Sequence, residues 1–310
     1  MTVSDDRAAI RSNRRLSDTF QDGENQFLRY SASSGDACRG ESVAVRSATL
    51  MFHASDEPGE IVATLIGPSA AIREIREDAV LASTVDARIL IAGEYGVGKR
   101  RLARLIHQQS LRSTGPFVTI RCSGLPDLQL AIRLFGDGRD ITGALSRADG
   151  GTLLLQDVDA LSPAIQDDLL NFLRSGEFQP VGSPGAIRST ARIVCSTTAR
   201  SLETRGSDDF STDLYYVLNS IYIRIPPLRE RSEDVEPLLD FFTAYYARRS
   251  GVGVPAMTSE SREGCRTHPW PANLRQLQAA AAMFALPVPS SSPADILESA
   301  ARLAGVHRPA

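Results

Sequence analysis

GEYGVGKR, residues 93–100, directly follows the apolar run at residues 89–92 and precedes an amphipathic stretch at residues 101–108. A strand that leads through a glycine-rich loop into a helix is the setting of a phosphate-binding loop. Its glycines let successive backbone N–H groups converge on an anion at the helix N-terminus, and a lysine adds a positive charge for the outer phosphates. The sequence therefore predicts a nucleotide site formed by Gly93, Glu94, Tyr95, Gly96, Val97, Gly98, Lys99 and Arg100.

The loop departs from the usual pattern at its eighth position. Arg100 stands where Ser or Thr would offer a hydroxyl to a metal ion. A plain turn or a helix cap is the competing interpretation of a glycine-lysine pair. We favour the phosphate loop because its three glycines and Lys99 share one strand-to-helix context.

Bulk composition limits the class of protein. The chain has 310 residues, 42% of them apolar, which is ample for one large domain or two modest ones. Its 34 basic and 37 acidic side chains give a net charge of −3, which neither favours nor excludes a nucleic-acid partner. Four scattered cysteines suggest neither a zinc site nor a disulfide framework. Because no apolar run would cross a bilayer and the N-terminus is not signal-like, we expect a cytoplasmic protein.

Hydrophobic patterning divides the chain into four parts. Residues 1–60 are a polar extension expected to be poorly ordered, with one candidate strand at 44–53. Residues 61–226 alternate helical patterns, such as 70–82, with strand-like runs at 89–92, 117–120, 152–155, 192–195 and 221–225, which predicts an α/β fold with a parallel sheet flanked by helices. Residues 227–287 carry only helical patterns, including 235–249 and 272–285, and predict a small all-α domain. A linker at 287–293 and a helix at 294–304 complete residues 288–310.

Together these features make the chain resemble the AAA+ ATPase module of bacterial sigma-54-dependent transcriptional activators. The resemblance covers about residues 64 to 287 and rests on ordered segments: LIGPSAAIREI, GEYGVGKRRLARLIHQQS, GPFVTIRCSGLP, LFG, ADGGTLLLQDVDAL, DLLNFLRSGEFQPVG, DLYYVLN, IPPLRERSEDV and HPWPANLRQL. It implies a P-loop AAA+ sheet with a helical lid, ATP or ADP as ligand, and a homo- or hetero-oligomer. The partner it implies is RNA polymerase with its sigma factor.

The acidic pair expected from the family is altered. Where relatives carry Asp for magnesium and Glu for the attacking water, this chain has Gln156 and Asp157. Gln lacks the charge that holds Mg²⁺, and Asp is one methylene shorter than Glu, so we expect weakened magnesium binding and leave the metal site unassigned. Asp157 remains the candidate catalytic carboxylate, with Asp159 nearby on a different strand face. Alternatively, these are ordinary polar residues at a strand end.

Further positions that the resemblance makes functional have also changed. The arginines that relatives supply to a neighbouring subunit match Ser211 and Val217, and the asparagine that communicates with the catalytic Glu matches Arg121. The first sensor position holds Thr198, whereas Arg275 keeps the arginine of the second sensor and is expected to contact nucleotide. The pattern predicts that nucleotide binding is retained and hydrolysis is reduced.

Two partner-binding features are incomplete. The sigma-54 contact loop of relatives, GAFTGA, corresponds to GDGRDITGALSRADGG, in which Ile141 replaces the aromatic and both flanks are shorter. Residues 299–308 resemble the first helix of a Fis-type helix-turn-helix, and the chain ends where the recognition helix would begin, so we expect DNA contact to be weak or indirect. An ordinary terminal helix is the alternative.

Three functions follow as hypotheses. The first is an ATP-binding transcriptional regulator with weak or absent hydrolysis that acts through a protein partner, such as a paralogous activator. The second is an active AAA+ ATPase in which Asp157 and Asp159 take over the missing roles. The third is a sigma-54-independent, DNA-associated regulator.

Overall fold

The computed structural model describes residues 65–198, 210–285 and 292–305. The chain divides into a unit of residues 1–58 and a unit of residues 59–310, and every described residue lies in the second. The predicted polar extension and its candidate strand at 44–53 lie outside the described residues.

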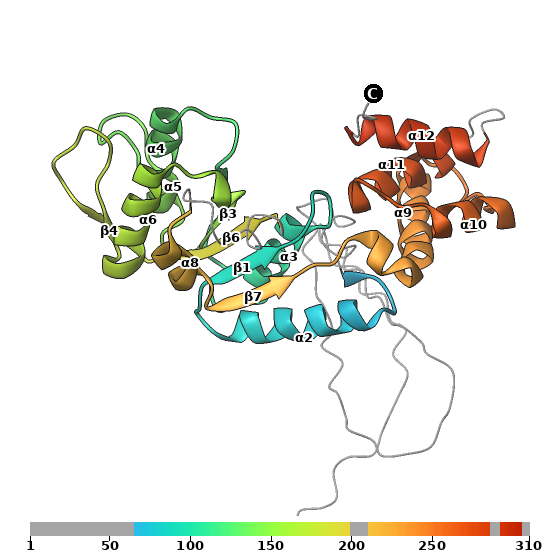
Figure 1. Ribbon diagram of the computed structural model, residues 1–310, viewed down its shortest axis with the longest axis horizontal. Coiled ribbons are helices and arrows are strands. Elements are labelled where there is room, and N and C mark those ends of the chain that lie inside the picture. The colour runs from blue at the N-terminus through green and yellow to red at the C-terminus, as the bar shows by residue number, and fades with distance from the viewer. Residues whose placement is uncertain (1–64, 199–209, 286–291, 306–310) are drawn as a thin grey trace, which may run out of the picture. The chain divides into compact units, whose positions relative to one another are not determined.

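A five-stranded parallel sheet forms the centre of the α/β part (Figure 1). Its order is β2-β3-β6-β1-β7, and its strands are β1 (Ile89–Ala92), β2 (Phe117–Arg121), β3 (Thr152–Gln156), β6 (Arg192–Thr197) and β7 (Ile221–Arg224). All five predicted strands are confirmed, with bounds that differ by at most two residues. A separate antiparallel hairpin pairs β4 (Glu177–Phe178) with β5 (Ile187–Arg188).

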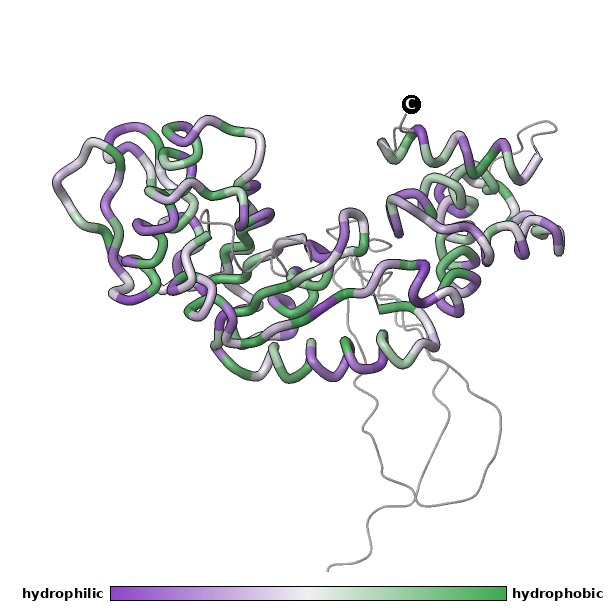
Figure 2. The backbone as a smooth tube through the Cα atoms, in the orientation of Figure 1, coloured by the Kyte–Doolittle hydropathy of each residue, from purple (hydrophilic) through white to green (hydrophobic). Residues whose placement is uncertain are grey.

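Helices cover both faces of this sheet. They are α2 (Ala70–Thr84), α3 (Lys99–Gln108), α4 (Asp127–Phe135), α5 (Ala144–Arg147), α6 (Pro163–Ser175) and α8 (Thr212–Leu218). Alternate strand residues point to opposite faces. Leu153 and Leu155 pack with α4, α5, α6 and α8 in one core cluster, whereas Leu154 is buried outside that cluster, on the face where α3 contacts β3. Figure 2 shows the resulting hydrophobic strands in green.

A group of four helices follows β7: α9 (Val235–Arg249), α10 (Ser259–Thr267), α11 (Asn273–Ala285) and α12 (Pro293–Leu303). Their common core surrounds Trp270, which is fully buried and donates its indole N–H to Cys265 O at 2.9 Å. The predicted linker extends too far, because Ser292 caps α12 in a capping box and Pro293 is the first residue of that helix. The rest of that linker, 287–291, lies outside the described residues.

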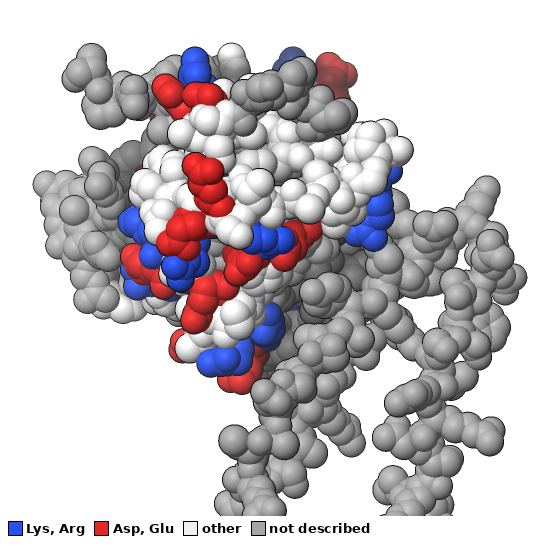
Figure 3. Space-filling model, turned by 90° about the vertical axis from the view of Figure 1, so that its right-hand side faces the viewer, with Lys and Arg blue, Asp and Glu red and all other residues white. Residues whose placement is uncertain are grey.

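Charged side chains on this helical region are of both signs. Arg262 pairs with Glu236 at 3.0 Å and with Asp240 at 2.9 Å. Figure 3 shows acidic and basic side chains beside one another on the face turned to the viewer. This face therefore carries charges of both signs.

Candidate nucleotide-binding site

The loop between β1 and α3 has the backbone geometry of an anion cradle. Gly96 and Gly98 have φ of 81° and 109°, in the left-handed region, and Gly98 is the N-cap of α3. At Gly96 a Cβ atom would also lie 2.2 Å from Ala272 O. The structure thus requires glycine here for two reasons, backbone conformation and close approach of another segment. The predicted strand–loop–helix context is confirmed.

Lys99 opens α3 and turns back over the loop. Its Nζ donates to Gly93 O at 2.7 Å and to Glu94 O at 3.0 Å. Burial lowers the pKa of Lys99, and the carboxylates of Asp157, Asp159 and Glu94 act in the opposite direction. The ammonium therefore lies within a group of acidic side chains at the carboxyl ends of the strands. Arg100 is exposed on the first turn of α3.

Residues that come after β7 in the sequence also contact the phosphate loop. Arg229 forms a bidentate ion pair with Glu94 at 2.7 and 2.6 Å. Asn273, fully buried with φ of 51°, donates to Tyr95 O at 2.9 Å and to Glu94 Oε2 at 3.3 Å. Its Oδ1 accepts from Leu228 N at 2.7 Å. We call the set of Glu94, Arg229, Asn273 and Leu228 the loop tether.

Further contacts join α11 to the loop and to α3. Leu274 N donates to Gly96 O at 3.1 Å, and Arg101 donates to Gln278 Oε1 at 2.8 Å. Arg275 is exposed, and its guanidinium lies over the Tyr95 ring with the Cζ atom 5.4 Å from the ring centroid. Arg275 and the phosphate loop, predicted separately from sequence, are thus brought together.

Asp157 is held at the end of β3 by its neighbours. The residue has φ 57° and ψ 51°, a left-handed conformation that an aspartate adopts at some cost. Ser123 Oγ donates to Asp157 Oδ2 at 2.8 Å, and Arg121 Nε lies 4.0 Å from the same oxygen. Arg121 is directly opposite Gln156 in the parallel register of β2 and β3. This ion pair was not predicted from the sequence, although both of its residues had been singled out.

Asp159 does not lie on a strand face, so that expectation is wrong. It belongs to the short 3-10 helix η2 (Val158–Ala160), into which the chain turns after the left-handed Asp157. Its Oδ1 accepts from Thr197 Oγ1 at 2.6 Å. The side chain is therefore tied to the end of β6, the strand adjacent to β3.

The two residues expected to stand where relatives bind magnesium, Gln156 and Asp157, lie at this edge of the sheet. Among the described residues, no three His, Cys, Asp or Glu side chains are grouped as metal ligands. Gln156 offers a neutral amide, and the Asp157 carboxylate already accepts from Ser123. Mg²⁺ prefers carboxylates and phosphate oxygens in octahedral geometry.

Ser211 and Val217, which we expected to stand where relatives have arginines, have structural roles within the chain. Ser211 caps α8, with its Oγ accepting from Leu214 N at 3.3 Å and its own N–H donating to Gln166 Oε1 at 2.7 Å. Val217 is half-buried and packs against the core. Thr198 follows β6, and its carbonyl oxygen accepts from Thr197 Oγ1 at 3.3 Å.

Residues 136–143 form a compact turn between α4 and α5. The Asp137 carboxylate accepts backbone N–H groups of Arg139, Asp140 and Ile141 at 3.0, 3.0 and 2.8 Å. These bonds, led by that of Ile141, lower the pKa of Asp137. A β-bridge between Gly136 and Thr142 closes the turn. The Ile141 side chain lies on the surface of this turn and is 48% exposed.

Comparison with known proteins gives two family matches. Residues 65–224, just over half of the chain, match the Sigma-54 interaction domain. Residues 229–291 match an AAA+ ATPase lid domain.

Curated relatives are transcriptional regulators. The chain is 36% identical over 244 residues to the C4-dicarboxylate transport transcriptional regulatory protein DctD of Rhizobium meliloti, covering 74% of this chain and 53% of the relative. It is 33% identical over 222 residues to the HTH-type transcriptional regulatory protein TyrR of Enterobacter agglomerans, covering 69% of this chain and 43% of that protein. It thus spans about half the length of these relatives.

Solved structures of NtrX from Brucella abortus share the fold. The complex with ADP superposes with a TM-score of 0.68 at 30% identity, covering 75% of this chain and 54% of NtrX. The complex with ATP gives a TM-score of 0.68 at 29% identity, covering 78% of this chain and 59% of NtrX.

Within the described ranges, no helix has the length and apolar character needed to span a membrane.

Proposed function

Because this chain belongs to the Sigma-54 interaction domain family of AAA+ proteins, we propose that it binds ATP or ADP and regulates transcription through a protein partner, with little or no ATP hydrolysis. The observation that carries this proposal is a contrast within one site. The phosphate loop has left-handed glycines and Lys99 at the start of α3, whereas Asp157 is engaged by Ser123 and Arg121.

Nucleotide binding is supported by the loop and its surroundings. Backbone N–H groups at the N-terminus of α3 and the ammonium of Lys99 would hold the phosphates. Arg275, stacked on Tyr95, is placed beside the loop and would add a second cation. NtrX, which shares this fold, was crystallised with both ADP and ATP. Bound ATP would supply a γ-phosphoryl group that water can attack.

Weak hydrolysis is supported by what surrounds the position of attack. Asp157 is one methylene shorter than the family's Glu, and its carboxylate is engaged by Ser123 Oγ at 2.8 Å and lies 4.0 Å from Arg121 Nε. Ser211 and Val217 offer no guanidinium to a neighbouring subunit. Arginine fingers contribute about 10³- to 10⁵-fold in rate where they have been measured. The alternative of an active ATPase is disfavoured because Asp159, its second acid, is tied to Thr197.

The case for a paralogous partner rests on few residues. Segments 213–216 and 228–231 belong to the stretches that resemble the family, but Leu214 and Leu228 are fully buried and Arg229 belongs to the loop tether. Packing within the chain is sufficient to explain these three. Tyr216, 67% exposed on α8, remains available for contact with a second subunit. We propose a mixed oligomer in which an intact relative supplies the arginines and the sigma-54 contact loop.

Binding and turnover on the purified chain test this function. We expect ATP to bind the wild type and not Lys99→Ala, and to bind Asp157→Ala unchanged. Turnover should be at background, and Gln156→Asp with Asp157→Glu should not restore it unless arginines are also placed at Ser211 and Val217. Steady-state hydrolysis that disappears in Asp157→Ala would instead establish the active ATPase.

The transcriptional part of the proposal needs a separate assay. In a purified system with sigma-54 polymerase, this chain alone should not open a promoter, because its turn around Ile141 lacks the aromatic side chain and the length of the family's loop. A candidate activator should bind it in co-purification and change its output when it is present. Promoter opening by the chain alone would refute the proposal, as would failure to associate with any activator.

A further inference from the structure

A cavity of about 290 Å³ lies at the amino-terminal end of the parallel strands, the end opposite to the phosphate loop. Its wall includes the segment before β1, the first residue of β6 and the end of α6. The charged residues of this wall are Asp86, Arg88, Arg112 and Arg192. Three cations and one anion therefore line one small space.

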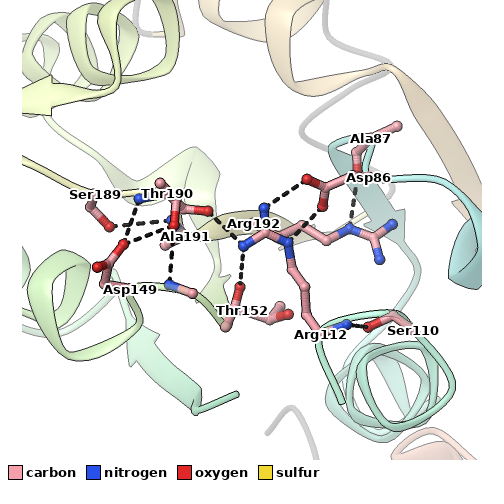
Figure 4. A network of polar contacts seen from close by, with 12 residues as sticks. Asp86, Ala87, Ser110, Arg112, Asp149, Thr152, Ser189, Thr190, Ala191 and Arg192 are labelled. Carbon is pink, nitrogen blue, oxygen red and sulfur yellow. Dashed lines mark hydrogen bonds and ion pairs between the residues drawn. The ribbon is translucent and has the colours of Figure 1, made fainter. Parts of the chain in front are cut away.

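The single carboxylate of the wall is already neutralised. Asp86 accepts from Arg112 Nε at 2.8 Å and from Arg112 Nη2 at 2.7 Å, and Arg112 Nη1 donates to Thr190 O at 2.7 Å (Figure 4). This bidentate pair lowers the pKa of Asp86 and raises that of Arg112. Asp149 is not part of the wall, and its Oδ1 accepts from Thr190 N at 2.7 Å and from Thr190 Oγ1 at 2.9 Å.

Arg192 has no such carboxylate partner. The residue is only 5% exposed, and its Nε and Nη2 donate to Ala87 O at 2.9 Å and Ala82 O at 2.6 Å. Both acceptors are neutral backbone carbonyls. Burial lowers the pKa of Arg192, and the charge of Arg112 acts in the same direction while that of Asp86 opposes it. A buried cation of this kind is stabilised when an anion enters hydrogen-bond distance.

Arg88 adds a second positive charge to the same space. It is half-buried, and its Nη2 donates to Leu173 O near the end of α6. Beside these arginines the wall has an apolar part formed by Phe172, Leu173 and Ile193. The cavity therefore combines guanidinium donors with a surface that suits carbon atoms.

We propose that this cavity binds a small organic oxyanion, a carboxylate or a phosphate ester, between Arg88 and Arg192. The bonds described above use Nε and Nη2 of Arg192 and Nη2 of Arg88, so the Nη1 groups would donate to the anion, and charge-assisted hydrogen bonds of this kind are strong for both carboxylates and phosphates. The volume is at the lower end of the range for ligand pockets and suits a metabolite of roughly ten non-hydrogen atoms. A ligand here would contact the segment before β1, the start of β6 and the end of α6, and would act as an effector distinct from nucleotide.

Calorimetric titration of the full chain tests this site with two probes. Succinate represents the carboxylates and glycerol 3-phosphate the phosphate esters, while succinamide and glycerol are the uncharged controls. We expect one of the two anions to bind saturably and neither control to bind. Binding must persist in Lys99→Ala, which removes the ammonium of the phosphate loop. Anion binding that is lost in Lys99→Ala would place the ligand at the nucleotide site and overturn the proposal.

Variants of the wall locate the ligand. Arg88→Gln keeps a donor for Leu173 O and should bind the anion at least about tenfold more weakly. Arg174 is exposed on α6, next to Leu173, and Arg174→Gln should leave anion binding unchanged. Ser220→Asp, which keeps every arginine and adds a carboxylate to the wall, should weaken anion binding as well. If both anions fail to bind at about 10 mM, or if Arg88→Gln and Ser220→Asp bind as the wild type does, the cavity is not an oxyanion site.

Discussion

Replacing Asn273 by alanine should both destabilise the helical region and weaken nucleotide binding, because this one side chain bonds to Leu228 and to the phosphate loop at Tyr95. The substitution removes the acceptor 2.7 Å from Leu228 N and the donor 2.9 Å from Tyr95 O. A buried N–H group without an acceptor costs about 1–3 kcal/mol. The left-handed backbone at φ 51° adds about 1 kcal/mol for alanine. We therefore expect a loss of about 2–4 kcal/mol in the free energy of unfolding.

Two further substitutions separate these contributions. Asn273→Gly loses the same hydrogen bonds but tolerates the backbone, so it should be about 1 kcal/mol more stable than Asn273→Ala. Asn273→Asp keeps an acceptor for Leu228 N–H but replaces the donor that lies 3.3 Å from Glu94 Oε2 with a second carboxylate. It should therefore bind ATP more weakly than the glycine variant does, since like charges would displace Glu94 from the loop.

Urea unfolding followed by tryptophan fluorescence provides the measurement. Trp270 is the only tryptophan of the chain, is fully buried, and lies in the core of the helical region. A destabilised variant should shift the urea midpoint without changing the m-value. If Asn273→Ala and Asn273→Gly both unfold at the wild-type midpoint and bind ATP normally, the loop tether contributes nothing and the reasoning fails.

Three other predictions use single side chains. Lys99 is the only lysine of the chain, so an amine-reactive reagent should modify this one side chain. Half-maximal labelling should occur below pH 10.5 because burial lowers the pKa of Lys99, and mass spectrometry should show that ATP protects it. Gly96→Ala should abolish ATP binding in a calorimetric titration, whereas Gly124→Ala, with the same φ of 81° and open space around its Cβ, should leave it unchanged. Burial raises the pKa of Cys122 to about 12, and the other described cysteines are also buried, so Cys38→Ser should not react with a thiol reagent at pH 8 until denaturant is added.

Local sequence patterns were sufficient to predict the sheet. The run Ile89-Leu90-Ile91-Ala92 is buried at every position, and the glycine-rich loop that follows fixes where the strand ends and the helix begins. The helix at 235–249 was predicted with its observed bounds. Such features depend on residues close in sequence, whose periodicity and backbone preferences act independently of the rest of the fold.

Contacts between distant residues could not be predicted in the same way. Glu94 and Arg229 are 135 positions apart, and nothing in either motif indicates that one holds the other. Predicting the Arg121–Asp157 pair would have required knowing that β2 lies beside β3 in parallel register. Asp159 was misplaced because a left-handed turn at Asp157, which alternation along a strand does not anticipate, moves the chain into a 3-10 helix.

The turn at residues 136–143 also makes this chain a convenient acceptor for loop grafting. Its ends are fixed by the bridge between Gly136 and Thr142, while its interior is organised by the single carboxylate of Asp137. Lengthening a closed loop costs little entropy, about 0.6 kcal/mol for each doubling. A foreign segment inserted between these anchors would therefore leave the flanking helices α4 and α5 in place, so that binding loops from other proteins can be displayed on the same scaffold and compared directly.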